Sequence, residues 1–169
     1  MATPDFVLEL RRHVGHAPLW MPGTTVVILR PAPGCAPIDW ERPIAPEAVE
    51  VLCVRRSDNG AWTPVTGIVD PGEEPAVAAA REALEEADVR RLLSVEVVGP
   101  VTYYNGDVTT YLDVAFAAQW VNGEPSPADG ENSETAFFRG DQLPPMNDRF
   151  RRAVAKALSA EASADFLTA

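Results

Sequence analysis

The sequence is short of the side chains that build thiolate and imidazole metal sites: 169 residues contain two cysteines, Cys35 and Cys53, and two histidines. The cysteines do not have the spacing of a metal site, and two histidines, His13 and His16, are too few for a histidine-rich one. So few cysteines favour a reduced, cytoplasmic protein. Long hydrophobic runs are also missing, because no apolar stretch approaches the ~20 residues of a membrane-spanning helix. Residues 1–16 have no apolar core behind their charges, so we expect no secretory signal and no membrane partner.

Positive charge is scarce too. The chain has 14 lysines and arginines against 25 aspartates and glutamates, a formal net charge of −11. Binding to a nucleic-acid backbone needs a basic surface, so this balance argues against nucleic acid as a partner. The acids are unevenly placed, since residues 67–91 and 122–134 each carry a net charge of −4. That distribution suggests an acidic site that metal ions complete before it meets a phosphate substrate.

The order of helix and strand patterns predicts one domain, an α+β or α/β sandwich with a mixed sheet. The expected helices cover Pro4–His16, Pro75 to about Ala87, and Asp148–Ala160. The expected strands cover residues 18–30 (bent at Pro22-Gly23), 49–56, 61–66, 92–104, 107–120 and 135–138. Between the first two strands, the proline-rich residues 31–46 predict a surface loop, and we expect its Trp40 to fold back over the domain.

The helix that begins at Pro75 carries its acids on one side. At about 100° per residue, we expect its core-facing side to hold Val77, Ala80, Leu84 and Ala87. Glu82, Glu85 and Glu86 lie on the other side, where like charges repel by roughly 0.2–0.5 kcal/mol per close pair. A hard divalent cation, Mg²⁺ with Mn²⁺ as the alternative, is the obvious neutralising partner, because it takes carboxylate oxygens and shares itself with substrate phosphates.

A glutamate in the loop before this helix has a potential partner within it. Glu73 precedes the helix, and Arg81 lies two turns along it. An arginine and a carboxylate can form two parallel hydrogen bonds, so we expect this pair to stiffen the loop against the helix.

The segment Gly67–Val89 resembles the Nudix box. The box pattern is a glycine, five residues, a glutamate, seven residues, and then Arg-Glu-apolar-any-Glu-Glu-any-Gly-apolar. The chain keeps six of the seven positions of fixed identity, namely Gly67, Glu73, Arg81, Glu82, Glu85 and Glu86. Asp88 stands where the pattern has a glycine that ends the helix, and aspartate tolerates a left-handed cap better than most residues do.

The resemblance implies a Nudix-type α/β/α sandwich and hydrolysis of a nucleoside diphosphate linked to another group. It implies that Glu82, Glu85 and Glu86 bind the metal, with the Gly67 carbonyl as a further ligand. The general base is either one of these glutamates or an acid from another loop. Glu131 and Glu134 lie in such a segment with no cation near them in the sequence, and Glu134 is preferred because it directly precedes the strand expected at 135–138.

Substrate contacts are harder to infer from the sequence. Arg55 and Arg56 alternate on a strand, so one of them can reach a substrate phosphate while the other points away. Tyr103, Tyr104 and Trp120 are expected mainly to pack on the sheet, and Tyr104 is the candidate for substrate contact, because the family often places selecting residues there. The substrate is left open among ADP-ribose or another nucleotide sugar, a (d)NTP, a dinucleoside polyphosphate and a dinucleotide.

Two further expectations concern organisation and activity. The chain divides into an arm at residues 1–20, a Nudix domain at 21–160 and a tail at 161–169; the resemblance implies that the arm forms a homodimer contact. The alternative to an enzyme is a catalytically silent Nudix module that binds a nucleotide as a regulator. An inactive relative would typically lose box carboxylates, and this chain has lost none, which favours the enzyme.

Overall fold

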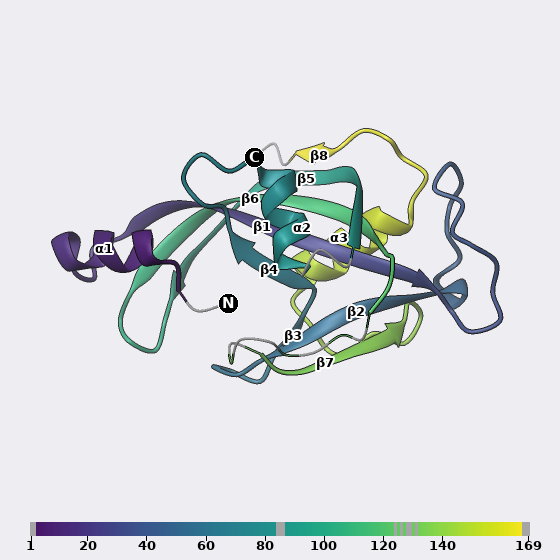
Figure 1. Ribbon diagram of the computed structural model, residues 1–169, viewed down its shortest axis with the longest axis horizontal. Coiled ribbons are helices and arrows are strands. Elements are labelled where there is room, and N and C mark those ends of the chain that lie inside the picture. The colour runs from purple at the N-terminus through teal and green to yellow at the C-terminus, as the bar shows by residue number, and fades with distance from the viewer. Residues whose placement is uncertain are drawn as a thin grey trace.

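The computed structural model describes residues 3–83, 87–123, 125, 127, 130 and 132–166 (Figure 1). Three α-helices and a short 3₁₀ helix accompany the strands within these ranges. The helices are α1 (Asp5–Val14), η1 (Pro46–Ala48), α2 (Pro75–Glu82) and α3 (Asp148–Leu158). The strands are β1 (Leu19–Pro31), β2 (Val49–Arg56), β3 (Trp62–Thr63), β4 (Val65–Ile68), β5 (Ala87–Thr102), β6 (Val108–Trp120), β7 (Asn132–Arg139) and β8 (Asp165–Phe166).

The long strand β1 lies at the centre of the sheet. The strand order is β3-β2-β1-β6-β5-β8, with β4 also paired to β1 and β7 to β2. β1 runs parallel to β6, and β8 runs parallel to β5, whereas the other pairs are antiparallel. The predicted mixed sheet is therefore confirmed. The bend predicted at Pro22-Gly23 is wrong: β1 continues through it, because β4 pairs with it from Gly23 and β6 along Leu19–Leu29.

Alternate residues of β1 face two different helices, since side chains alternate across a strand. Val26 belongs to a buried cluster with Ala79 of α2, whereas Val27 belongs to a second buried cluster with Val154 of α3. The sheet thus lies between α2 and α3, as Figure 1 shows. This arrangement confirms the predicted α/β/α sandwich.

The long hairpin and the closing helix agree with prediction. β5 and β6 pair from Ala87↔Trp120 to Thr102↔Val108. Asn147 caps α3 by accepting a hydrogen bond from the Arg149 backbone N–H at 3.0 Å. In the proline-rich loop, Trp40 Nε1 donates to Gln119 Oε1 at 3.1 Å, which confirms that the loop folds back.

The predicted end of the box helix is wrong. α2 ends at Glu82, and Ala87 and Asp88 lie in β5 opposite Trp120 and Gln119. Asp88 is therefore a strand residue, not a left-handed helix cap. Ala87 is 7% exposed in the sheet, so pairing with a distant strand outweighs its local preference for helix.

The predicted core-facing side of α2 is also displaced. Val77 is 57% exposed, and Ala80 is half-buried. Ala78, Ala79 and Ala83 are buried instead. Their small side chains allow the helix to lie close to the sheet. Leu84, which was also predicted on that side, lies outside the described residues.

Strands extend into both segments that were predicted to flank the Nudix domain. β1 begins at Leu19, so it crosses the boundary predicted between residues 20 and 21. In the predicted tail, β8 pairs with β5. Asp165 Oδ1 forms an ion pair with Nζ of the buried Lys156 at 2.7 Å. Among the described helices, none is both long enough and apolar enough to cross a membrane.

Candidate active site

Arg81 of α2 is fixed by the loop that precedes its helix. Its Nε and Nη2 donate to the two carboxylate oxygens of Glu73 at 2.9 and 2.8 Å. These two parallel bonds confirm the predicted Glu73–Arg81 pair. The charge-assisted bond lowers the pKa of Glu73 below its usual range and raises the pKa of Arg81.

The same guanidinium also contacts the next residue of the helix and the end of β4. Arg81 Nη1 donates to Glu82 Oε1 at 2.8 Å, and Nη2 donates to the Ile68 carbonyl at 3.1 Å. Glu73 Oε2 also accepts from the Asp70 backbone N–H at 3.0 Å. One arginine therefore joins three parts of the box segment: β4, the loop and α2.

The carboxylate of Glu82 lies against the backbone of β4. Its side chain is 7% exposed, so it does not project into solvent from the helix. A Cβ added at Gly67 would lie 2.0 Å from Glu82 Cδ and 2.3 Å from Oε1, closer than real side chains approach. The glycine is thus required by packing, because it leaves the space that the Glu82 carboxylate fills.

The donors around Gly67 and Glu82 fit a hard divalent cation. Mg²⁺ takes oxygen ligands, and the buried Glu82 carboxylate that packs against Gly67 supplies oxygens of this kind. Within the described ranges, no three histidine, cysteine, aspartate or glutamate side chains are grouped closely enough to hold a metal. The predicted ligands Glu85, Glu86 and Glu131 lie outside those ranges.

Glu134 lies beside an arginine that the sequence does not place near it. In the β2–β7 ladder Arg55 is the partner of Glu134, and their side chains approach to 3.6 Å with about half of each exposed. Glu134 thus has a cation beside it in the fold although none lies near it in the sequence. Arg56 donates to both carboxylate oxygens of Asp58 at 2.9 and 2.7 Å, within its own hairpin turn.

The candidate aromatic residues have different environments. Tyr104 is 93% exposed at the turn between β5 and β6, so it does not pack on the sheet. The Tyr103 hydroxyl lies 2.5 Å from the Tyr111 hydroxyl, and Trp120 packs edge-on against Phe137 with ring centroids 5.5 Å apart. Tyr103 and Trp120 thus pack as predicted, and Tyr104 is left as an exposed candidate.

Sequence reasoning missed a buried polar cluster behind β1. Asp113 is 4% exposed and accepts from Thr25 Oγ1 at 2.8 and 3.1 Å and from Arg149 Nη1 at 3.2 Å. Burial raises the pKa of Asp113, and the neighbouring Arg149 opposes that rise. The available signal was an acid within the apolar pattern of β6, Leu112–Ala118.

The NUDIX domain family model matches residues 42–158, more than half of the chain. The chain belongs to the Nudix family. It is also 31% identical over 113 residues to the NAD-capped RNA hydrolase NudC of Vibrio cholerae. That match covers 65% of this chain and 39% of the relative, so the chain spans well under half of NudC's length.

Solved Nudix structures have the same fold. The MutT Nudix hydrolase of Burkholderia pseudomallei aligns with a TM-score of 0.53 at 23% identity, covering 82% of this chain and 97% of that one. An ADP-ribose pyrophosphatase of Streptococcus suis aligns with a TM-score of 0.54 at 17% identity, covering 86% and 96%. The family match and the NudC relative support the predicted class of enzyme, a pyrophosphohydrolase.

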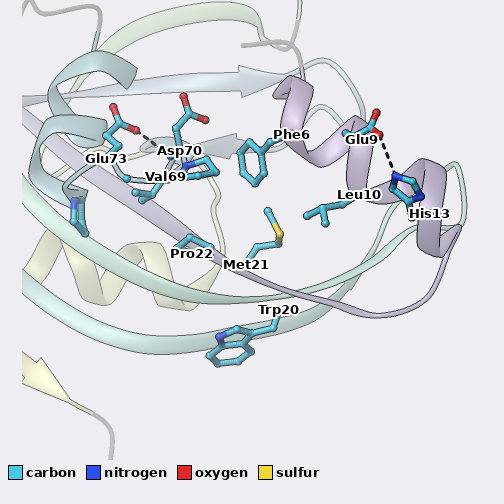
Figure 2. A pocket seen from close by; sticks show the side chains of 13 residues that line it. Phe6, Glu9, Leu10, His13, Trp20, Met21, Pro22, Val69, Asp70 and Glu73 are labelled. Atoms are coloured by element: carbon cyan, nitrogen blue, oxygen red, sulfur yellow. Dashed lines mark hydrogen bonds and ion pairs between the residues drawn. The ribbon is translucent and has the colours of Figure 1, made fainter.

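A cleft beside the Nudix box is built partly from residues that precede the family match. It has a volume of about 720 Å³ and lies between α1 and the loop before α2. Figure 2 shows Phe6 and Leu10 of α1 on one side and Asp70 and Glu73 on the other, with Met21 below Phe6. Glu73 therefore borders this cleft as well as holding Arg81.

Proposed function

We propose that this Nudix protein hydrolyses the diphosphate bond of a nucleoside diphosphate linked to another group, with Mg²⁺ or Mn²⁺ as cofactor. The observation that carries the proposal is the buried Glu82 carboxylate, packed against Gly67 and bonded to an arginine that Glu73 holds. Such an arrangement is preorganised, because each side chain is already oriented before a substrate arrives.

The residues of the box have distinct roles in this proposal. Glu82, Glu85 and Glu86 bind the cation, with Gly67 as a further ligand and Glu131 as an additional one. A cation held there screens the phosphate oxygens and lowers the pKa of the attacking water. Arg81 and Glu73 position Glu82. Glu85 or Glu134 is the general base, and Glu134 lies 3.6 Å from Arg55 at the exposed end of the β2–β7 ladder.

The substrate proposed is a small nucleotide in which a diphosphate joins two groups. NudC acts on NAD-capped RNA, and solved structures with this fold include an ADP-ribose pyrophosphatase and a UDP-X diphosphatase. The compounds in these names (NAD, ADP-ribose and UDP-X) each contain a nucleotide joined through a diphosphate to another group, which supports this substrate class. Arg55, Arg56 and the exposed Tyr104 are the proposed contacts to the parts of the substrate outside the diphosphate.

The experiment compares two glutamate variants of the same segment. With Mg²⁺ and a panel of NAD⁺, ADP-ribose, UDP-glucose, dATP and Ap4A, the wild type is expected to release a nucleoside monophosphate from at least one substrate. Glu82→Gln should lower kcat by about 100-fold or more, as expected when a reacting group is misplaced. Glu74→Gln is the matched control, because Glu74 is exposed and its side chain does not cap α2. Equal activity of both variants would refute the assignment of Glu82.

We propose a homodimer contact through the N-terminal arm. α1 exposes Leu10 by 40% and Val14 by 43%, and these two residues are four apart, so they lie on one face of the helix. Light scattering is expected to give twice the monomer mass for the wild type and the monomer mass for Leu10→Asp/Val14→Asp. A monomeric wild type at micromolar concentration would contradict this proposal.

A further inference from the structure

We propose that Thr25 and Asp113, on the strands behind the Nudix box, are positioning residues for Gly67 and, through it, for the metal-binding Glu82. This inference rests on the proposed function, since it assigns the support of the same site. It concerns residues outside the box, and Thr25 precedes the family match altogether.

A side-chain hydrogen bond between Thr25 and Asp113 connects β1 to β6. Thr25 Oγ1 donates to both carboxylate oxygens of Asp113, and Arg149 Nη1 lies 3.2 Å from Asp113 Oδ2 and 3.4 Å from Thr25 Oγ1. Thr25 is fully buried, and the Asp113 side chain is 6% exposed. A buried and satisfied polar network of this kind fixes the geometry of the strands that carry it.

This network lies next to Gly67, the first residue of the Nudix box, because β1 pairs with β4. Thr25 pairs with Thr66 in the β1–β4 ladder, and Thr24 pairs with Gly67. Gly23, the ladder partner of Asp113, lies where the network and the box meet. A Cβ added there would lie 3.5 Å from Asp113 Oδ1 and 3.6 Å from the Gly67 carbonyl oxygen. The Asp113 carboxylate and the Gly67 carbonyl therefore border the same glycine.

The position of β4 determines where the Glu82 carboxylate lies. Gly67 leaves too little room for even a Cβ beside Glu82, so a small shift of β4 changes the position of the carboxylate. In metal sites, the groups that orient the ligands matter nearly as much as the ligands, and losing one costs 10–100-fold in metal affinity or activity as a rule of thumb. The bond between Thr25 and Asp113 fixes β1 against β6. β1 in turn pairs with β4, and the Glu82 carboxylate packs against the backbone of β4 at Gly67.

A second ion pair of the same kind provides a matched control. Glu96 is the partner of Asp113 in the β5–β6 ladder, and it accepts from Arg152 of α3 at 3.4 Å. Its side chain is 11% exposed. It thus ties the same helix to the same sheet, but from β5, which does not pair with β4 or with β1. Loss of this pair should affect the attachment of α3 without moving Gly67.

The experiment measures metal binding, kinetics and stability in parallel on the 169-residue chain. Mn²⁺ binding is followed by electron paramagnetic resonance, kcat and KM with the preferred substrate by product release, and melting by calorimetry. Thr25→Val removes the hydroxyl at nearly constant shape and is expected to weaken Mn²⁺ binding and lower kcat by about 10–100-fold with KM little changed. Thr25→Ser restores the donor and should recover both. Asp113→Asn, which still accepts from Thr25, should fall between them.

The outcomes separate this inference from the proposed function. If Thr25→Val binds Mn²⁺ and turns over like the wild type, or if Glu96→Gln loses as much as Thr25→Val, the positioning role is overturned. If Thr25→Val and Thr25→Ser lose activity equally with a matching loss of melting temperature, the cluster is a general stabiliser and the inference is also overturned. A wild type that neither binds Mn²⁺ nor hydrolyses any nucleotide overturns the proposed function itself.

Discussion

Substitution of Gly67 by alanine tests the packing at the centre of the site. Gly67 has no positive φ, so its backbone accommodates alanine without strain. The added Cβ would lie 2.0 Å from Glu82 Cδ, whereas real Cβ contacts are essentially never under 3.0 Å. Relief therefore needs a movement of about 1 Å, and a misplacement of about that size costs on the order of 100-fold in rate. We expect Gly67→Ala to lower kcat/KM by about that factor.

The stability cost of Gly67→Ala should be modest. Overpacking by a methyl group destabilises a protein by about 1–3 kcal/mol, so the variant should remain folded at 25 °C. Calorimetry gives the melting temperature, and product release with Mg²⁺ gives kcat/KM. In a Glu82→Ala background the collision is gone, so Gly67→Ala should then cost little more in either assay, a non-additive result. Full activity of the single Gly67→Ala variant would refute the argument that Gly67 is required by the Glu82 carboxylate.

Three further predictions concern the same site. Arg81→Lys loses the planar fork that reaches Glu73 and Glu82 together, so kcat should fall by about 10–100-fold, measured by product release; an active Arg81→Lys enzyme would show that the fork is dispensable. The pKa of Glu73 is lowered by Arg81, so this pair stabilises the fold above the unfolded pKa of about 4.3 and the gain is lost as pH falls through the folded pKa. Between about pH 3 and 6, the melting temperature of Glu73→Gln should therefore change less with pH than that of the wild type, as measured by calorimetry. The same change in both proteins would contradict this. Chelation by EDTA should abolish hydrolysis and Mg²⁺ or Mn²⁺ should restore it, so activity that survives exhaustive chelation excludes the proposed cofactor.

The box region was predictable because its chemistry is local. Glu73 and Arg81 lie within a short stretch of chain, and they pair as predicted. The bond from Arg81 to Glu82 was not predicted. The fold-back of the loop at Trp40 also followed from an aromatic residue in a proline-rich loop, although its partner Gln119 did not. The β-branched, apolar residues of 18–30 predicted a buried strand, and the two faces of β1 contact two different helices.

Pairings between distant strands could not be predicted. Ala87 has a high preference for helix, yet it lies in β5 because Trp120 of β6 is its partner. Arg55 neutralises Glu134 through the register of β2 with β7, and nothing near Glu134 in the chain indicates this. The cluster of Asp113 with Thr25 and Arg149 likewise joins three elements that are far apart in the sequence. These contacts depend on register, which local patterns do not encode.

Hydrolysis of a nucleotide panel by the purified protein, with Mg²⁺ present and with the Glu82→Gln variant beside it, tests the central claim most directly. The account predicts that the wild type releases a nucleoside monophosphate from at least one diphosphate-linked nucleotide, and that Glu82→Gln, folded and of equal melting temperature, does not. Tight nucleotide binding by the wild type without any turnover would contradict it and would identify the silent regulatory module instead.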